Sequence, residues 1–113
     1  MNATDFISEG EYKALKAHAD KEESIRFGRE IKGEKGAKYS VTICSSRYVG
    51  TGEYFMFYHY SRKFRCESLT GGWSIDGGTF DIDFSSYESV KEEINRVFRH
   101  CPDCYASEQI SLF

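Results

Sequence analysis

The sequence lacks several features that would point directly to a function. It has one proline, Pro102, and no apolar run approaching the length that crosses a membrane. Acidic residues outnumber basic ones by 18 to 15, so the chain does not have the basic balance of a dedicated nucleic-acid-binding domain. The N-terminus has no basic segment followed by an apolar one. We therefore expect no signal peptide, a cytoplasmic location and four cysteines that are free thiols.

Sequence motifs of catalytic chemistry are also missing. No glycine-rich phosphate loop opens a predicted helix, and the chain contains neither Gly-x-Ser-x-Gly nor His-Glu-x-x-His. The Gly-Thr-Gly sequence at 50–52 lies between two predicted strands, where a turn is expected. The sequence therefore predicts a protein that is not an enzyme, that requires no cofactor and that does not act on a membrane.

Aromatic residues, by contrast, are abundant, at 16% of 113 residues. A chain of this length and composition can bury a core without metal or disulfide cross-links. We predict one domain over residues 1–104, followed by a short tail over residues 105–113.

The first segment of the domain predicts a helix. Ser8 and Glu11 have the spacing of a capping box, and Tyr12, Leu15 and Ala19 then recur at helical spacing. Residues 24–32 fit either a strand or a continuation of this helix.

The middle of the chain predicts strands, because apolar and polar residues alternate and glycines separate the runs. The strongest run begins near residue 53, and it is followed by a second alternating run over residues 63–69. Gly77 and Gly78 predict a bulge or a further turn. We expect an antiparallel meander of four to five strands. In the strongest run one face carries Phe55, Phe57 and His59, and the other carries Tyr54, Met56, Tyr58 and Tyr60.

The last helix has the clearest pattern. Ser85 and Glu88 have the spacing of a second capping box, and Pro102 is expected to end the helix near His100. Its apolar stripe consists of Tyr87, Val90, Ile94, Val97 and Phe98, and the polar positions Lys91, Glu92, Glu93 and Arg96 are expected to face water.

These elements together predict an α+β domain. Its order is an N-terminal helix, then the antiparallel meander, and then a C-terminal helix that packs on the sheet. Both helices are expected on one face. The tyrosine-bearing face of the strongest strand is then left for a further helix or a partner, such as a second copy in a homodimer.

The last five residues read Gln-Ile-Ser-Leu-Phe and resemble the peptide by which clients bind the bacterial sliding clamp, whose pattern is Gln-Leu-Ser/Asp-Leu-Phe. The resemblance implies that Leu112 and Phe113 fill an apolar pocket on the clamp and that Gln109 sets the register. Ser111 fits the pattern, whereas Ile110 replaces the usual leucine. This match implies a clamp-binding accessory of replication or repair, or a phage or plasmid protein that uses the host machinery.

Two other surfaces are candidates. Acidic residues alternate along the last strand and continue onto the final helix, where they could mimic DNA phosphates, as anti-restriction and anti-CRISPR inhibitors do; the solvated face of an ordinary domain is the simpler interpretation. These residues are Asp76, Asp81, Asp83, Glu88, Glu92 and Glu93. Aromatic and basic residues also lie close together in the sequence, as they do in proteins that bind single-stranded nucleic acid. Because the chain as a whole is acidic, a hairpin with charged residues at its tip is the simpler interpretation. The residues of this second candidate surface are Tyr58, Tyr60, Arg62, Lys63 and Arg65.

Cysteines offer a last candidate. Cys101 and Cys104 form a Cys-x-x-Cys pair after the final helix, and a structural zinc would need two further ligands, for which the candidates are Cys44, Cys66, His59 and His100. The simpler interpretation is a turn with ordinary thiols, since no second Cys-x-x-Cys pair exists.

Overall fold

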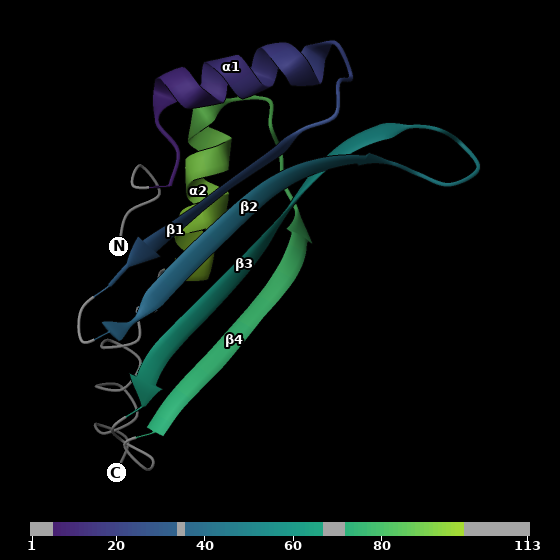
Figure 1. Cartoon of the computed structure of the whole chain (residues 1–113). Helices are drawn as coiled ribbons and strands as arrows, with labels where there is room; N and C mark the ends of the chain where they lie inside the picture. The colour runs from purple at the N-terminus through teal and green to yellow at the C-terminus, as the bar shows by residue number, and fades with distance from the viewer. Residues whose placement is uncertain (1–5, 34–35, 67–71, 99–113) are drawn as a thin grey trace.

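An N-terminal helix, a four-stranded antiparallel sheet and a second helix make up the fold (Figure 1). The computed structural model describes residues 6–33, 36–66 and 72–98. The elements are α1 (Glu9–Asp20), β1 (Arg26–Lys32), β2 (Lys38–Arg47), β3 (Tyr54–Cys66), β4 (Gly72–Asp81) and α2 (Tyr87–Phe98). The predicted α+β class is confirmed.

The sheet is a plain meander in which each strand pairs with the next along the chain. Residues 26–32 form a strand and do not continue the first helix. The first alternating run and residues 63–66 of the second form one strand, β3, of 13 residues; residues 67–69 lie outside the described residues.

The glycine pair Gly77-Gly78 does not interrupt β4, so the predicted bulge or turn is wrong. A Cβ atom at residue 77 would lie 2.6 Å from the carbonyl oxygen of Tyr60, and one at residue 78 would lie 3.2 Å from the Tyr60 ring. Glycine therefore allows the two strands to lie close together. The Tyr60 ring passes over the glycine and stacks on Phe80, with ring centroids 5.9 Å apart.

The capping box at the start of α1 is confirmed, and it also connects the helix to the sheet. The Ser8 hydroxyl accepts a hydrogen bond from the Glu11 amide at 3.1 Å, and the Glu11 carboxylate accepts one from the Ser8 amide at 2.9 Å. The same carboxylate accepts two hydrogen bonds from the guanidinium of Arg29 on β1. These hydrogen bonds, first that of Arg29 and then that of Ser8, lower the pKa of Glu11 to about 2.

Replacing Glu11 by Gln should lower the free energy of unfolding at pH 7 by about 0.5–1 kcal/mol, because Gln preserves the capping box but loses the charge that pairs with Arg29. The pKa of Glu11 is lower in the folded chain than its ordinary value of 4.5, so this stabilisation is complete above pH 4.5 and is lost as the pH falls towards 2. Urea unfolding at pH 7, 4 and 2.5 should show the difference between wild type and E11Q shrinking. A difference that is constant over this range would contradict the assignment.

The core lies between the two helices and one face of the sheet. Figure 1 shows α2 behind the strands and α1 across the top of the sheet. The apolar residues of both helices join those of the strands in one buried cluster. The largest side chains with almost no exposed surface are Tyr58, Phe6, Ile7, Ile43, Ile94 and Val90.

The face of β3 that packs against the helices is the tyrosine-bearing one, so the predicted orientation of this strand is wrong. Tyr58 is fully buried, Met56 is 8% exposed, and Tyr54 and Tyr60 pack against the core cluster. A buried tyrosine needs a polar partner for its hydroxyl. For Tyr58 that partner is the carboxylate of Glu93 on α2.

The apolar stripe of α2 is confirmed, since Val90, Ile94 and Val97 are all buried. The predicted capping box is wrong by one residue: the hydroxyl of Ser86, not that of Ser85, accepts a hydrogen bond from the Ser89 amide at 3.1 Å. The Glu88 carboxylate lies 3.0 Å from the Lys91 ammonium instead.

Glu93, which the sequence predicts to face water, is only partly exposed in the fold. Its carboxylate accepts hydrogen bonds from the Tyr58 hydroxyl and from the Arg96 guanidinium at 2.7 Å. Burial acts to raise the pKa of Glu93, but these two hydrogen bonds and the positive charge of Arg96 together outweigh it and hold the pKa below its ordinary value. The result is a polar contact that fixes α2 on the sheet. Within the described ranges, neither helix combines the length and apolarity that crossing a membrane requires.

Candidate functional site

The face of the sheet that points away from the helices carries no described element over it (Figure 1). We call it the open face. Its residues follow from the register, because residues paired across antiparallel strands point to the same side.

A chain of aromatic rings runs along β3 on the open face. Tyr48, at the end of the β2–β3 hairpin, stacks on Phe55 with ring centroids 4.3 Å apart. Phe55 contacts Phe57 at 5.7 Å, and Phe57 meets the edge of His59 at 5.3 Å. Tyr48 is 47% exposed, the two phenylalanines are half-buried and His59 is exposed. We refer to these four residues as the aromatic ladder.

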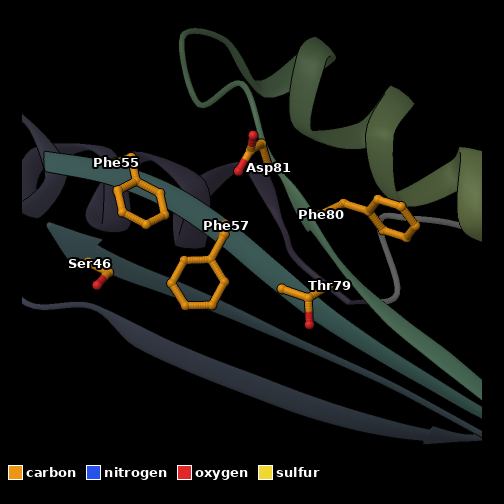
Figure 2. Close-up of a pocket in the computed structure, with 6 residues that line it drawn as sticks. All are labelled: Ser46, Phe55, Phe57, Thr79, Phe80 and Asp81. Carbon is orange, nitrogen blue, oxygen red and sulfur yellow. The ribbon is translucent and has the colours of Figure 1, made fainter. Parts of the chain in front are cut away.

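A shallow hollow of about 460 Å³ lies beside the ladder. Figure 2 shows Phe55 and Phe57 next to each other on β3, with Asp81 on the neighbouring strand β4. The hollow is lined by Ser46, Phe55, Phe57, Thr79, Phe80 and Asp81. Phe80 pairs with Tyr58, so its ring points to the helix-covered side of the sheet. The open side of the hollow therefore combines the rings of Phe55 and Phe57 with two hydroxyls and one carboxylate.

Further along the open face, three lysines form a row across three strands. Lys32 pairs with Lys38, and Lys38 pairs with Lys63. Lys32 and Lys38 are exposed, and the Lys63 ammonium lies 4.9 Å from the centroid of the Trp73 ring. We refer to these three lysines as the lysine row.

The lysine row is costly to the folded chain on its own, because like charges placed directly opposite each other destabilise a sheet. Among the described residues, no ion pair involves any of the three lysines. An anionic ligand would relieve this repulsion.

Small residues occupy the surface between the ladder and the lysine row. Two rows across the strands consist mainly of glycine, serine and threonine, so this part of the face is flat. These rows are Gly28, Thr42, His59 and Thr79, and then Glu30, Ser40, Ser61 and Gly77. Apart from His59 and Glu30, a ligand that lies across these two rows meets only small side chains.

The open face is also more basic than the rest of the chain. On β1–β4, its described side chains include four cations and two anions, whereas the whole chain has a net charge of −3. The cations are Arg26 and the lysine row, and the anions are Glu30 and Asp81. Positive charge is thus concentrated on the uncovered side of the sheet.

The nucleic-acid surface that the sequence suggested is divided between the two faces. Tyr58 and Tyr60 lie on the helix-covered face, where Tyr58 has no surface on which a base could stack. Arg62, on the same face, pairs with Asp76 and donates to the carbonyl of Val97 at 3.0 Å. The hydrogen bond to Asp76 raises the pKa of Arg62.

Lys63 alone among the described side chains of that candidate set lies on the open face. The backbone of Arg65 pairs with Trp73 further along the strand, and the arginine side chain is outside what the structure describes. The sequence signal for the open face is the alternation of Phe55, Phe57 and His59, which places three rings on one side of the strand.

The acidic residues do not form one surface. Asp76 lies on the helix-covered face, and Asp81 lies on the open face. Asp83 accepts a hydrogen bond from the Ser85 amide at 3.0 Å, and hydrogen bonding to Ser85 lowers the pKa of Asp83. On α2, Glu88 pairs with Lys91, Glu93 pairs with Tyr58 and Arg96, and Glu92 is exposed.

A zinc site that contains both Cys44 and Cys66 is incompatible with the sheet. Cys44 pairs with Phe57, and Cys66 lies nine residues further along β3. Nine residues of strand span about 30 Å, which is far beyond the reach of two ligands of one metal ion. Among the described residues there is no group of three or more metal-ligating side chains. Cys101 and Cys104 lie outside the described residues, as does the tail over residues 105–113.

Comparison of the chain with protein-family models, with curated proteins and with solved structures finds no match in any of the three.

Proposed function

We propose that this protein is a non-enzymatic binding protein whose open face holds single-stranded nucleic acid. The observation that carries the proposal is the aromatic ladder placed on the same uncovered sheet face as the lysine row. Aromatic rings give unpaired bases a stacking surface worth about 1–3 kcal/mol per base, and lysines hold the phosphates.

The shape of the surface favours a single strand over a duplex. A duplex hides the faces of its bases within the stack, whereas an unpaired strand can lay them on exposed rings. Four-stranded sheets with aromatic side chains on one face are a known way of binding unpaired bases.

The dimensions fit a short segment. Phe57 and Lys63 are six residues apart on β3, which is a distance of about 20 Å along the strand. This length suits a site at the lower end of the range of single-strand binders, about four nucleotides. Because the chain as a whole is acidic, we expect binding to be modest and sensitive to salt.

Fluorescence anisotropy with a labelled 12-nucleotide single strand tests the proposal. The wild-type protein should bind at 20 mM salt and more weakly at 200 mM, and replacing both Phe55 and Phe57 by Ala should weaken binding about 10- to 100-fold through lost stacking. Val49→Ala, at the fully exposed tip of the hairpin, is the control and should change little. No binding at low salt, or equal binding of a duplex, would overturn the proposal.

The C-terminal sequence supports a second function, which is compatible with the first. We propose that residues 109–113 dock on a bacterial sliding clamp, with Leu112 and Phe113 as anchors and Gln109 setting the register; this rests on the resemblance of the five residues. A lone peptide of this kind should bind with roughly micromolar affinity. A protein that holds both a single strand and the clamp would act at replicating DNA, in a bacterium or for a phage or plasmid.

Calorimetry with a purified bacterial clamp tests the docking peptide. The intact chain should bind with roughly micromolar affinity, and changing Leu112 and Phe113 to Ala should abolish binding by removing about 1.5–3 kcal/mol per side chain. The Phe55/Phe57 variant serves as the control, because it should bind the clamp normally. Failure of the intact chain to bind would remove this function without affecting the first.

The anti-defence inhibitor stays a prediction, as does a homodimer. An inhibitor that acts through its acidic residues should lose activity on charge reversal at Asp81, Asp83 and Glu92, and it should keep activity when the tail is deleted. Neither clamp docking nor single-strand binding gives this combination of results.

A further inference from the structure

Asp81 is an unexpected residue on a surface that would bind a polyanion. It is exposed, it lies on the open face, and it pairs directly with Phe57 of the aromatic ladder. Among the described residues its side chain makes no ion pair and no hydrogen bond. Its carboxylate is therefore available to a ligand, and it would repel phosphate groups.

The position of Asp81 suits the edge of a base. Directly opposite residues in a sheet have Cβ atoms about 4.5–5.5 Å apart. A base stacked on the Phe57 ring therefore extends over the neighbouring strand, where the hollow of about 460 Å³ contains the Asp81 side chain (Figure 2). The base edge, unlike the phosphate, contains hydrogen-bond donors that a carboxylate can accept from.

The four bases differ in what their unpaired edges offer to a carboxylate, which has two acceptor oxygens and no donor. Guanine presents two adjacent donors, N1–H and the N2 amino group, which match the two oxygens. Adenine and cytosine present one amino donor next to a bare ring nitrogen. Thymine and uracil present one N–H between two carbonyl oxygens. Guanine is thus the base that allows a bidentate, charge-assisted pair.

We propose that the hollow formed by Phe55, Phe57, Ser46, Thr79 and Asp81 is a guanine-selective pocket, in which the base stacks on Phe57 and donates from N1 and N2 to the Asp81 carboxylate. This inference rests on the proposed binding of a single strand at the open face. The carboxylate also keeps phosphates away from this end of the face, and so directs the backbone towards the lysine row.

The test compares four 12-nucleotide strands of thymidine that carry one guanine, adenine, cytosine or thymine at the centre. Anisotropy at 50 mM salt should show the guanine strand bound about tenfold more tightly than the all-thymine strand, because of the charge-assisted pair. Inosine in place of guanine lacks the N2 amino group and should lose most of this preference.

Asp81→Asn is the matched variant, since it preserves the shape of the side chain but exchanges one acceptor oxygen for a donor. It should reduce the guanine preference to less than about twofold and leave binding of the all-thymine strand unchanged or tighter, as a negative charge is removed. Equal affinity for all four strands, or a guanine preference that survives in Asp81→Asn, would overturn the pocket alone. No binding of any strand would overturn the proposed function and the pocket with it.

Discussion

Changing Lys32, Lys38 and Lys63 together to Ala should weaken binding of a single-stranded oligonucleotide by about 100-fold at 50 mM salt, because three phosphate contacts and their counterion release are lost. The slope of log affinity against log salt concentration should become shallower by about 2, because each phosphate contact with a single strand contributes about 0.7 to this slope and three contacts are lost. Anisotropy at four salt concentrations measures both quantities.

The same variant should fold at least as well as the wild type. Its three lysines are neighbours in one row of the sheet, so removing them relieves repulsion of a few tenths of a kcal/mol. Thermal unfolding should therefore show an unchanged or higher midpoint. A loss of binding without a loss of stability is the combination expected of residues that serve a ligand.

The control is a second triple variant in which Lys13 and Lys16 of α1 and Lys21, the residue that follows the helix, are changed to Ala. It removes the same total charge from the helix side of the molecule. If both triple variants weakened binding equally, only the net charge would matter, and the assignment of the phosphate contacts to the lysine row would be wrong.

Tyr58→Ala should lower the free energy of unfolding by about 3–5 kcal/mol, because a fully buried aromatic ring is removed from the centre of the core. This loss corresponds to a fall in the melting midpoint of about 15 °C or more in a domain of this size. Circular dichroism during heating measures the midpoint. Tyr58→Phe, which removes only the hydroxyl bonded to Glu93, should cost about 1 kcal/mol.

The neighbouring residue gives the sharper comparison. Phe57→Ala changes a half-buried ring on the open face and should cost about 1 kcal/mol or less. Two adjacent aromatic residues should therefore differ by several kcal/mol in stability, with only Phe57 contributing to binding. If Phe57→Ala were as destabilising as Tyr58→Ala, the open face would have to be packed, and the candidate site would be lost.

Local spacing was sufficient to predict most of the fold. The capping box at Ser8 and Glu11, the apolar stripe of α2 and the antiparallel meander are all properties of nearby residues, and all are confirmed. The cap of α2 was displaced by one residue because Ser85 and Ser86 are adjacent, and local spacing did not decide between them. The register of the cap depends on how the helix packs.

The faces of β3 could not be assigned in the same way, because both sets of alternating residues are aromatic. The buried face is set by packing against residues far away in the sequence, such as Glu93, which lies 35 residues beyond Tyr58 and accepts a hydrogen bond from its hydroxyl. The lysine row has a similar origin. Its members come from three strands, and only the pairing register places Lys32, Lys38 and Lys63 side by side. A site made from residues so far apart in sequence leaves no local motif.

The alternation along β3 has a consequence for the energetics of recognition. Phe57 lies on the open face, while the next residue, Tyr58, is buried in the core and hydrogen-bonded to Glu93. The packing of Tyr58 therefore restrains the backbone of β3 on the side opposite the ladder. Such a platform is preorganised: it should change little in shape when it is occupied, and the entropic penalty of association falls mainly on the flexible oligonucleotide. Differences in affinity among ligands should then appear chiefly as differences in residence time, while encounter rates stay similar.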